Sequence, residues 1–480
     1  MSPANFESLP NEMLLEIVSL LPRDANASLS LVNHRLRGLT RAEVFSRLVL
    51  SPYGPLRSLL AGEGPHARKK LQFWSSANMR PLVRSALVGT EVAADDRWHQ
   101  PPPSSTKYPQ ELQTLILSLL PQLQKLTTLS LSYLNLQLSD VAALVVTFLA
   151  SVRVTHCVLD VDPYLHDLLR HQWDLESLVL DDVMCYSDTR FWISLLNPSI
   201  LRTLHIPNDE WDIAVTFPRV DRLSIWFSDY IMVENIELMS KLPNITHLTI
   251  SSENVAEFDE PNLALFRTRW PLPALRVLVL ADLDALSMMP IFIPRSTAAP
   301  PPPYPHITTL TLTLACVFTD IPSYCAQLQQ LPTLQFLRLR LITLEHEPVL
   351  EDELTPVDVF RQFVTLEIPL PSALLAFALH AGVGIHELSE TPTQPSTFWS
   401  AFKSRCPGMA DLWLVGDDFL IHSSAHEGCA SYASEPVRQL RAEGQPVAEG
   451  DLGMYFTKRC SSEAELKAAQ KELDEWWDRL

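Results

Sequence analysis

Two histidines and a cysteine near the C-terminus have the residue types and spacing of a metal site. The segment His422-Ser-Ser-Ala-His426-Glu-Gly-Cys429 places two imidazoles four residues apart with a thiol close by, a spacing that suits zinc. No fourth ligand follows, and Gly428 argues against a continuous helix that would bring both rings to one face. We therefore predict two surface histidines in a loop and no metal site.

Glycine, which phosphate-binding loops require, is scarce in this chain. There are 13 glycines in 480 residues, and none lies between Gly89 and Gly382. Nucleotide-binding fingerprints need glycine so that backbone N–H groups approach the phosphates closely, and neither a Rossmann nor a P-loop pattern occurs. Gly-x-Ser-x-Gly, His-Glu-x-x-His and any assignable Ser/His/Asp or Cys/His set are absent too. We predict no catalytic residue and no cofactor; an alternative is an enzyme whose site lies in residues 382–460, where glycine returns.

Charge and composition disfavour nucleic-acid-binding, membrane-spanning and secreted classes of protein. The net charge is −19, and it is unevenly placed: residues 1–100 carry 12 − 9 = +3 and the other 380 carry 25 − 47 = −22. A body this acidic repels phosphate backbones, which disfavours nucleic-acid binding. The longest apolar run, Val141–Ala150, is too short for a membrane span, and the N-terminus does not resemble a signal peptide. Seven cysteines without a Cys-x-x-Cys pair indicate reduced thiols, hence a cytoplasmic or nuclear protein.

A short pattern, apolar-x-x-Leu-x-Leu/Ile, recurs along most of the chain at intervals of 19 to 46 residues. An eleventh copy, Val154–Leu159, has Cys157 in the leucine position. The ten copies with leucine are 126–131, 175–180, 201–206, 220–225, 245–250, 275–280, 307–312, 334–339, 363–368 and 409–414. Each copy predicts a short strand whose fourth and sixth residues point into a core, while the residues between them point outward.

The intervals between copies have the length of a return helix. Helical apolar faces are predicted at Ser139–Leu149, Asn235–Leu242 and Ser372–Leu379. One strand and one helix per repeat, stacked, make an α/β solenoid with parallel strands on one face and helices on the other. The unit resembles the leucine-rich-repeat family, whose pattern is Leu-x-x-Leu-x-Leu-x-x-Asn/Cys-x-Leu. Position 9 is never Asn or Cys here, so we expect an irregular arc.

Outward strand positions are the candidates for binding a protein target. Most of them are small, but two groups carry aromatic, arginine or histidine side chains, which are typical of interaction hot spots. Arg338 could instead pair with Glu367 as plain sheet stabilisation. The two groups are His205, Arg222, Trp226 and His247 on three adjacent repeats, and Phe336, Arg338 and Arg340 on one.

A different, helical segment precedes the repeats. Pro10 suits the start of a helix and Pro22 ends it. Met13, Leu20 and Leu31 lie off the two helical stripes, and forty residues are too few to bury them, so this excess of apolar surface predicts a partner. The stripes are Leu14, Ile17, Val18 and Leu21, then Leu29, Val32, Leu36 and Leu39.

This segment resembles an F-box, with Leu36 in place of the usual Trp or Phe. The residues that match the F-box pattern by position are Leu9, Pro10, Glu12, Ile17, Leu20, Leu31, Val32 and Arg35. With repeats following it, the chain resembles fungal F-box proteins. The resemblance implies that these residues, together with Leu14, dock on a Skp-type adaptor and through it on a cullin. The repeats would then recruit a target for a ubiquitin ligase; the alternative is an interaction scaffold that meets the adaptor without the cullin.

The resulting organisation has four parts. We predict an F-box-like helical domain over 1–48, a helical connector with a Pro-rich linker over 49–107, the repeats over 108–420, and a loop region with a final helix over 421–480. A capping box at Ser462–Glu465 begins that helix. Its apolar stripe is predicted to cover the end of the repeat stack, as exposed terminal repeats require.

Overall fold

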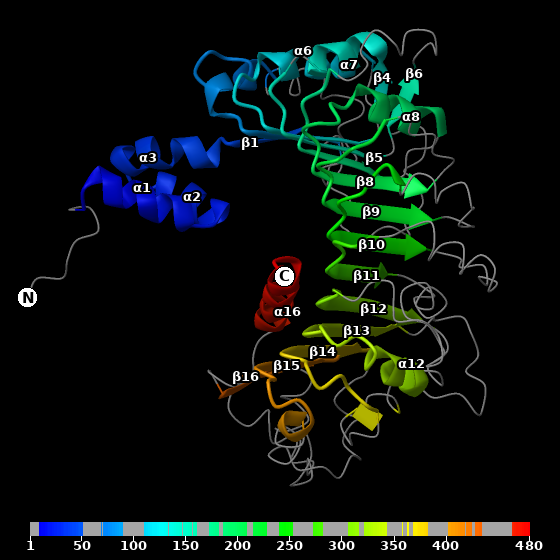
Figure 1. Ribbon diagram of the computed structural model, residues 1–480. Coiled ribbons are helices and arrows are strands. Elements are labelled where there is room, and N and C mark those ends of the chain that lie inside the picture. Colours follow the sequence, from blue (N-terminus) through cyan, green and yellow to red (C-terminus); the bar gives the residue numbers. More distant parts are fainter. Residues whose placement is uncertain are drawn as a thin grey trace, which may run out of the picture. The chain divides into compact units, whose positions relative to one another are not determined.

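The strands and helices of the computed structural model are shown in Figure 1. Two compact units form: residues 1–207 with 212–219, and residues 208–211 with 220–480. The residues that the structure describes are 9–50, 69, 71–89, 110–132, 134–145, 147–155, 157–160, 172–181, 186–208, 215–227, 240–252, 272–281, 306–315, 321–342, 358, 362–363, 368–382, 402–417, 419–424, 428–433 and 463–480.

The first unit begins with three helices and continues into a parallel sheet. The helices are α1 (Asn11–Leu20), α2 (Arg23–Ser30) and α3 (His34–Val44). The strands, in their order across the sheet, are β1 (Arg47–Leu50), β2 (Ser85–Val88), β3 (Thr128–Ser132), β5 (Ser151–Thr155), β7 (Ser177–Asp181) and β8 (Thr203–Asn208). Helices α6 (Gln110–Leu119), α7 (Leu138–Val145) and α8 (Tyr186–Leu195) lie between strands, with 3-10 turns at Arg80–Leu82 and Leu120–Gln122 and a small sheet of β4 (Asn135–Gln137) and β6 (Val158–Asp160).

The second unit is a sheet whose first seven described strands are parallel. They are β9 (Arg222–Phe227), β10 (His247–Ser252), β11 (Val277–Ala281), β12 (Thr309–Ala315), β13 (Phe336–Ile342), β14 (Ala376–Ala381) and β15 (Asp411–Val415). Two antiparallel strands follow, β16 (Phe419–Ser424) and β17 (Gly428–Ala433). Helix α12 (Ile321–Leu328) and the final helix α16 (Glu463–Asp478) lie on opposite sides of this sheet (Figure 1).

The pairing register explains why leucine recurs at the fourth place. Leu223, Leu248, Leu278, Leu310 and Leu337 pair in one row from β9 to β13, and all are buried. The residue after each, such as Thr249, faces the other side of the sheet; it is half-buried on β9 to β12 and buried on β13. Each strand therefore buries its leucine against its neighbours, which is the arrangement of a leucine-rich-repeat-like solenoid. Helix α7 confirms the helix predicted over Ser139–Leu149, whereas most of Asn235–Leu242 lies outside the described residues.

Two repeat assignments from the sequence are wrong. Copy 154–159 does not coincide with the strand of the large sheet. That strand is β5, whose inward residues are Val152 and Val154, and residues 158–159 belong to β6 of the small sheet. Copy 363–368 is not a strand in its described residues; Phe363 lies in a helical turn, and the next strand is β14. The helix predicted over Ser372–Leu379 is wrong for the same reason. Because β14 is buried on both faces except at half-buried His380, its sequence is a nearly continuous apolar run, and periodicity does not separate such a strand from a buried helix.

The boundaries of the repeat region also differ from those predicted. Strand β1 crosses the predicted boundary between the F-box-like domain and the helical connector, and β2 lies in that connector, so the sheet begins well before residue 108. The expected loop region over 421–480 contains most of β16 and all of β17. Strand β1 has the leucine pattern at Phe45–Leu50, a copy that was not predicted, whereas β2 has Ala86 and Val88 as inward residues and β16 pairs antiparallel through a short hairpin.

A glycine after β2 gives a direct test of the first repeats. Gly89 has φ of 124°, and an added Cβ would overlap Ser132 Oγ and lie 2.5 Å from the Ser132 carbonyl oxygen. We expect Gly89→Ala to lower the free energy of unfolding by about 1–3 kcal/mol, measured by chemical denaturation. The control is Gly38→Ala in α3, where nothing lies within 4 Å of the added Cβ. That helical change should stabilise by about 0.5–1 kcal/mol; equal effects of the two variants would contradict the β2–β3 contact.

Candidate protein-interaction surfaces

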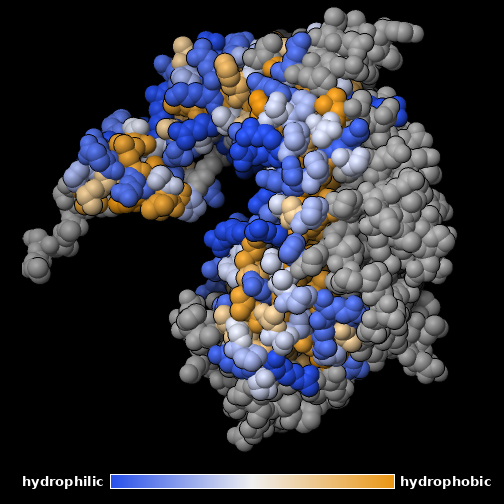
Figure 2. Space-filling view, in the orientation of Figure 1, coloured by the Kyte–Doolittle hydropathy of each residue, from blue (hydrophilic) through white to orange (hydrophobic). Residues whose placement is uncertain are grey.

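The N-terminal helices leave much of their apolar surface uncovered. Among the described residues, eight large hydrophobic side chains are exposed, and five of them lie between residues 13 and 32. These five are Met13, Leu15, Leu20, Leu31 and Val32, exposed by 50, 48, 80, 76 and 63%. Figure 2 shows apolar side chains gathered on this part of the chain. Such a concentration marks an interaction surface, because folded chains rarely leave contiguous apolar patches in water.

The core beneath this surface is small. Leu14, Val18 and Leu36 are its fully buried apolar residues within the three helices. Pro10 occupies the N-cap position of α1, so the helix begins where the sequence predicted, and Pro22, predicted to end α1, directly follows its C-cap residue and is also the N-cap of α2. Helix α3 is capped by Asn33, whose side chain accepts a hydrogen bond from the backbone N–H of Leu36. The helices are thus set by local signals and a few core contacts, with most apolar residues left outside.

The predicted adaptor-binding residues separate into three groups. Pro10, Glu12, Leu20, Leu31, Val32 and Arg35 are exposed, whereas Leu9 and Ile17 are half-buried. Leu14 is fully buried, so its place among the docking residues is wrong: it holds α1 in the core. Arg35 donates hydrogen bonds from Nη2 to the Leu9 carbonyl oxygen at 2.6 Å and from Nε to Asn11 Oδ1 at 2.9 Å. This arginine therefore fixes the start of α1, a role that the sequence pattern does not reveal.

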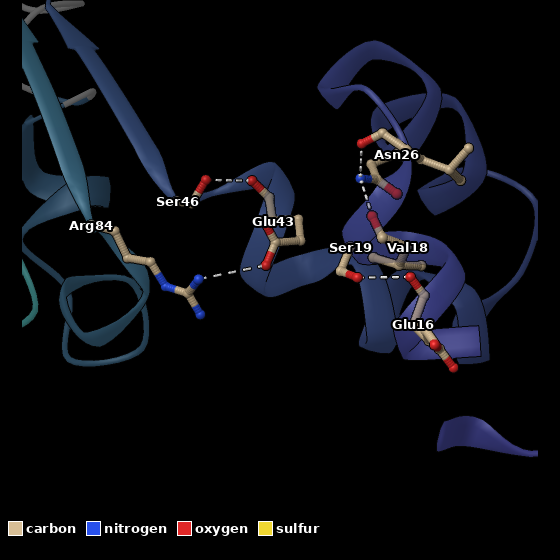
Figure 3. A network of polar contacts seen from close by, with 8 residues as sticks. Glu16, Val18, Ser19, Asn26, Glu43, Ser46 and Arg84 are labelled. Atoms are coloured by element: carbon tan, nitrogen blue, oxygen red, sulfur yellow. Dashed lines mark hydrogen bonds and ion pairs between the residues drawn. The ribbon is translucent and has the colours of Figure 1, made fainter. Parts of the chain in front are cut away.

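One buried polar side chain holds α1 and α2 together (Figure 3). Asn26 is almost fully buried, and its Nδ2 donates to the carbonyl oxygens of Val18 at 2.9 Å and Leu21 at 3.1 Å. Both carbonyls lie at the C-terminal end of α1, where few backbone donors remain, and the Val18 carbonyl also accepts from the Leu21 N–H at 3.3 Å. The other end of the helical part meets the first repeats through an ion pair of Glu43 with Arg84 at 3.8 Å.

We expect Asn26→Ala to destabilise the three helices by about 1–3 kcal/mol, because two carbonyl groups lose a buried donor. Amide hydrogen exchange across α1–α3 in the full chain measures the effect. Ser19→Ala is the matched control: Ser19 Oγ donates to the Glu16 carbonyl at 2.7 Å in an exposed position, so its loss should stay within about 0.5 kcal/mol. Unchanged exchange in the Asn26 variant would show that this contact does not hold the helices.

In the first unit, His205 belongs to a charged group on the outward face. His205 Nε2 lies 2.9 Å from Asp181 Oδ1, and Arg153 Nε lies 3.3 Å from Asp181 Oδ2. Strands β5, β7 and β8 bring the three side chains to neighbouring positions. His205 is thus placed beside Asp181, which ends its strand at the same face, and the sequence pattern gave no signal for this partner.

In the second unit, Arg222 and His247 pair across β9 and β10. Arg222 is exposed, and His247 is half-buried with its Nδ1 2.8 Å from Thr246 Oγ1. Burial lowers the pKa of His247, the charge of Arg222 lowers it further, and Asp221 opposes both. Trp226 lies in β9, but its side chain is outside the described part. These outward positions continue into small residues on β10 to β12, including Thr249 and Thr311.

Arg338 is placed differently from the sequence prediction. Its side chain is buried and forms an ion pair with Asp474 of α16, while its Nε donates to His380 Nε2 at 3.1 Å. Burial lowers the pKa of Arg338, although the hydrogen bond and charge of Asp474 act in the opposite direction. Glu367, the partner considered from sequence, lies outside the described residues. While α16 is in place, Arg338 is therefore not accessible to a target protein, whereas Arg340 is exposed.

Helix α16 covers the outward face of the last strands, whereas the sequence predicted that it covers the end of the stack. Phe336 and Trp476 have ring centroids 6.1 Å apart, and Trp413 lies 4.7 Å from Trp476 and 6.4 Å from Trp477. The buried residues of this cluster are Ala376, Ala378, Trp413, Val415, Leu420, Leu466, Leu473 and Trp477, with Phe336, Ala469, Trp476 and Leu480 partly buried against it. We use the name α16 seat for the strand residues of this cluster together with Arg338, that is Phe336, Arg338, Ala376, Ala378, Trp413, Val415 and Leu420.

His422 lies in β16 rather than in a surface loop. Its ring stacks on Trp413 with centroids 4.6 Å apart, and its Nε2 is 3.0 Å from Asp411 Oδ1. Asp411, Trp413 and His422 thus form a packed set across the last strands. Within the described part of the chain, no group of three His, Cys, Asp or Glu side chains is placed to hold a metal ion.

Comparison with known proteins adds little to this geometry. No protein-family model and no curated protein matches the chain. Among solved structures, the chain is similar to the crystal structure of the TLR13–ssRNA13 complex, with a TM-score of 0.33 and 16% identity over 61% of this chain and 36% of that one. The chain thus spans about a third of the length of the structure that it matches, and a TM-score of this size carries no argument. Among the described residues, no helix is both long and apolar enough to span a membrane.

Proposed function

We propose that this protein is the substrate-recruiting subunit of a Skp–cullin–F-box type ubiquitin ligase that acts in the cytoplasm or nucleus. Helices α1 to α3 dock on the Skp-type adaptor, and the outward face of the repeats holds a target protein. The protein performs no chemistry itself. It raises the concentration of the target near the ubiquitin-charged enzyme, so its contribution to the reaction is proximity.

The exposed apolar surface of α1 and α2 is the observation that carries this proposal. Leu20 and Leu31 are 80 and 76% exposed, although both lie within or directly after helices of the first compact unit. Both also occupy leucine positions of the F-box pattern. A surface of this kind supports a permanent protein partner, because apolar side chains gain free energy when a partner removes them from water.

The repeat sheets support the second half of the proposal. Parallel strands present rows of outward side chains from successive repeats, and this regular face suits the binding of another protein. In the second unit the face changes from exposed Arg222 through small residues to the α16 seat. An interaction role follows from this architecture, and the identity of the target does not.

Reconstitution tests the proposal. The purified chain is mixed with a recombinant Skp-type adaptor and then with a cullin, and the complexes are measured by size-exclusion chromatography with light scattering. We expect a three-component complex of one copy each. A complex that contains the adaptor and excludes the cullin would favour the cullin-independent scaffold. Absence of any adaptor complex would overturn the F-box assignment.

A further inference from the structure

The α16 seat differs in chemistry from the outward face of the strands before it. On β10 and β12 the central outward residues are Thr249 and Thr311, which are small and polar. In the same row, β14 has Ala378 and β15 has Trp413, and both are buried beneath α16. Val279 of β11 lies between Thr249 and Thr311 in the same row and is half-buried. The row therefore changes at β13 from small side chains to the buried Arg338, and then to Ala378 and Trp413 beneath α16.

We propose that the α16 seat is a docking site for an acidic, tryptophan-bearing amphipathic helix of the target, and that α16 is the occupant which the protein itself supplies. This inference rests on the proposed function, since it assigns the class of target segment that the repeats recognise. Helix α16 shows which side chains fit the site. Asp474 supplies a carboxylate for Arg338, and Trp476 packs its ring against Phe336 and Trp413. Leu466 and Leu473 belong to the same buried cluster as the alanines of β14.

The polar centre of the seat gives it selectivity. Arg338 is almost fully buried, so its charge must be matched by a carboxylate on whichever helix lies above it. Asp474 supplies that carboxylate, and Asp478 of the same helix adds a second favourable charge. His380 accepts from Arg338 Nε, and burial, with the charges of Arg338 and Arg340 in addition, holds the pKa of His380 well below its usual range. A helix without an acidic residue at this point would leave Arg338 buried and unpaired.

Two features of the contact between α16 and the seat favour replacement of α16 by another helix over permanent binding of α16. Burial removes water from Arg338 while Asp474 stays half-exposed beside it, so the ion pair contributes little net stability, and a fixed interface is served as well by apolar side chains. In addition, Trp477 Nε1 is buried with no hydrogen-bond partner among the described residues, which costs free energy whenever α16 is seated. Both costs lower the free energy that holds α16 without weakening the preference for a carboxylate.

Because α16 is joined covalently to the sheet, it competes with a free target helix for the seat at a high effective concentration. Residues 434–462 connect β17 to α16 in the sequence. Tethered segments meet their site at an effective concentration of about millimolar, so a free helix of equal affinity is largely excluded. A target helix therefore enters by binding the seat more tightly than α16 does, and the tail acts as a threshold for recruitment.

The experiment uses residues 461–480 as a fluorescent peptide and follows its anisotropy. The full chain and a chain that ends at residue 460 are compared, with circular dichroism and thermal unfolding to verify that the shortened chain is folded. We expect the shortened chain to bind the peptide at least 10-fold more tightly than the full chain. A peptide with Asp474→Arg should lose at least 10-fold in affinity, and Arg338→Glu in the shortened chain should restore part of it.

The matched control peptide carries Glu472→Arg, the same change of charge at an exposed position of α16. Its affinity should stay within twofold of that of the unchanged peptide. If a folded shortened chain does not bind the peptide, or if both charge changes act equally, the proposal is overturned.

A second variant covers the case in which the shortened chain does not fold. Full-length Asp474→Arg keeps the tail attached and weakens only its hold on Arg338. We expect this variant to bind the unchanged peptide at least 10-fold more tightly than the unaltered full chain. Equal, undetectable binding by both would show that α16 is a fixed part of the fold. Neither assay contains the adaptor, so failure here and failure of the F-box assignment are seen separately.

Discussion

Replacing Leu20 and Leu31 together by glutamate is expected to lower the affinity for a Skp-type adaptor by at least 100-fold. Both side chains are highly exposed, so the change removes apolar contact area and places two charges in the interface without disturbing the core of α1 to α3. Buried hot-spot residues each contribute about 2 kcal/mol or more, and about 1.4 kcal/mol corresponds to a factor of ten. Isothermal titration calorimetry with purified adaptor measures the loss.

Phe148→Glu is the matched control for this variant. Phe148 is 90% exposed and lies after α7, outside the helices assigned to the adaptor. Its replacement adds a charge at an equally open apolar position and should leave the adaptor affinity within twofold. Adaptor binding that survives the double replacement, or is lost equally in the control, would remove the basis for placing the docking surface on α1 and α2.

Leu248→Ala should lower the free energy of unfolding by about 2–5 kcal/mol, because it opens a cavity in the row of leucines that joins β9, β10 and β11. Leu248 is fully buried and pairs directly with Leu223 and Leu278. Urea denaturation followed by tryptophan fluorescence measures the change. We expect a similar loss for any leucine of this row, since each occupies the same position in its repeat.

Thr249→Ala supplies the comparison for Leu248→Ala. Thr249 is the next residue on β10 and faces outward, where a half-buried threonine makes few core contacts. Its replacement should cost less than about 1 kcal/mol. Comparable losses in the two variants would mean that the alternation of inward and outward residues on β10 is not as described.

The strands with leucine at the fourth place could be predicted from sequence because their pattern is local. A strand alternates its side chains between two faces, so a buried row appears directly as a spacing of two residues. Strands β9 to β13 follow this rule, with Leu223 to Leu337 in one row. Helix α1 was predictable for the same reason, because Pro10, Pro22 and its apolar stripe act within a few residues of themselves. The second predicted stripe is wrong as a single helix: Leu29 ends up in α2 and Leu36 in α3, with Val32 in the turn between them.

The far end of the repeats was decided by contacts between distant segments. Strand β14 is apolar on both faces because α16 covers the side that is open elsewhere, and this cover comes from residues about a hundred positions later. The partner of Arg338 is Asp474, 136 residues away, so no local spacing could select it over a nearer glutamate. The sequence by itself determined the strands with leucine at the fourth place and the N-terminal helices that lack a core. Only the tertiary structure decided which outward face stays open, because that depends on where the final helix packs.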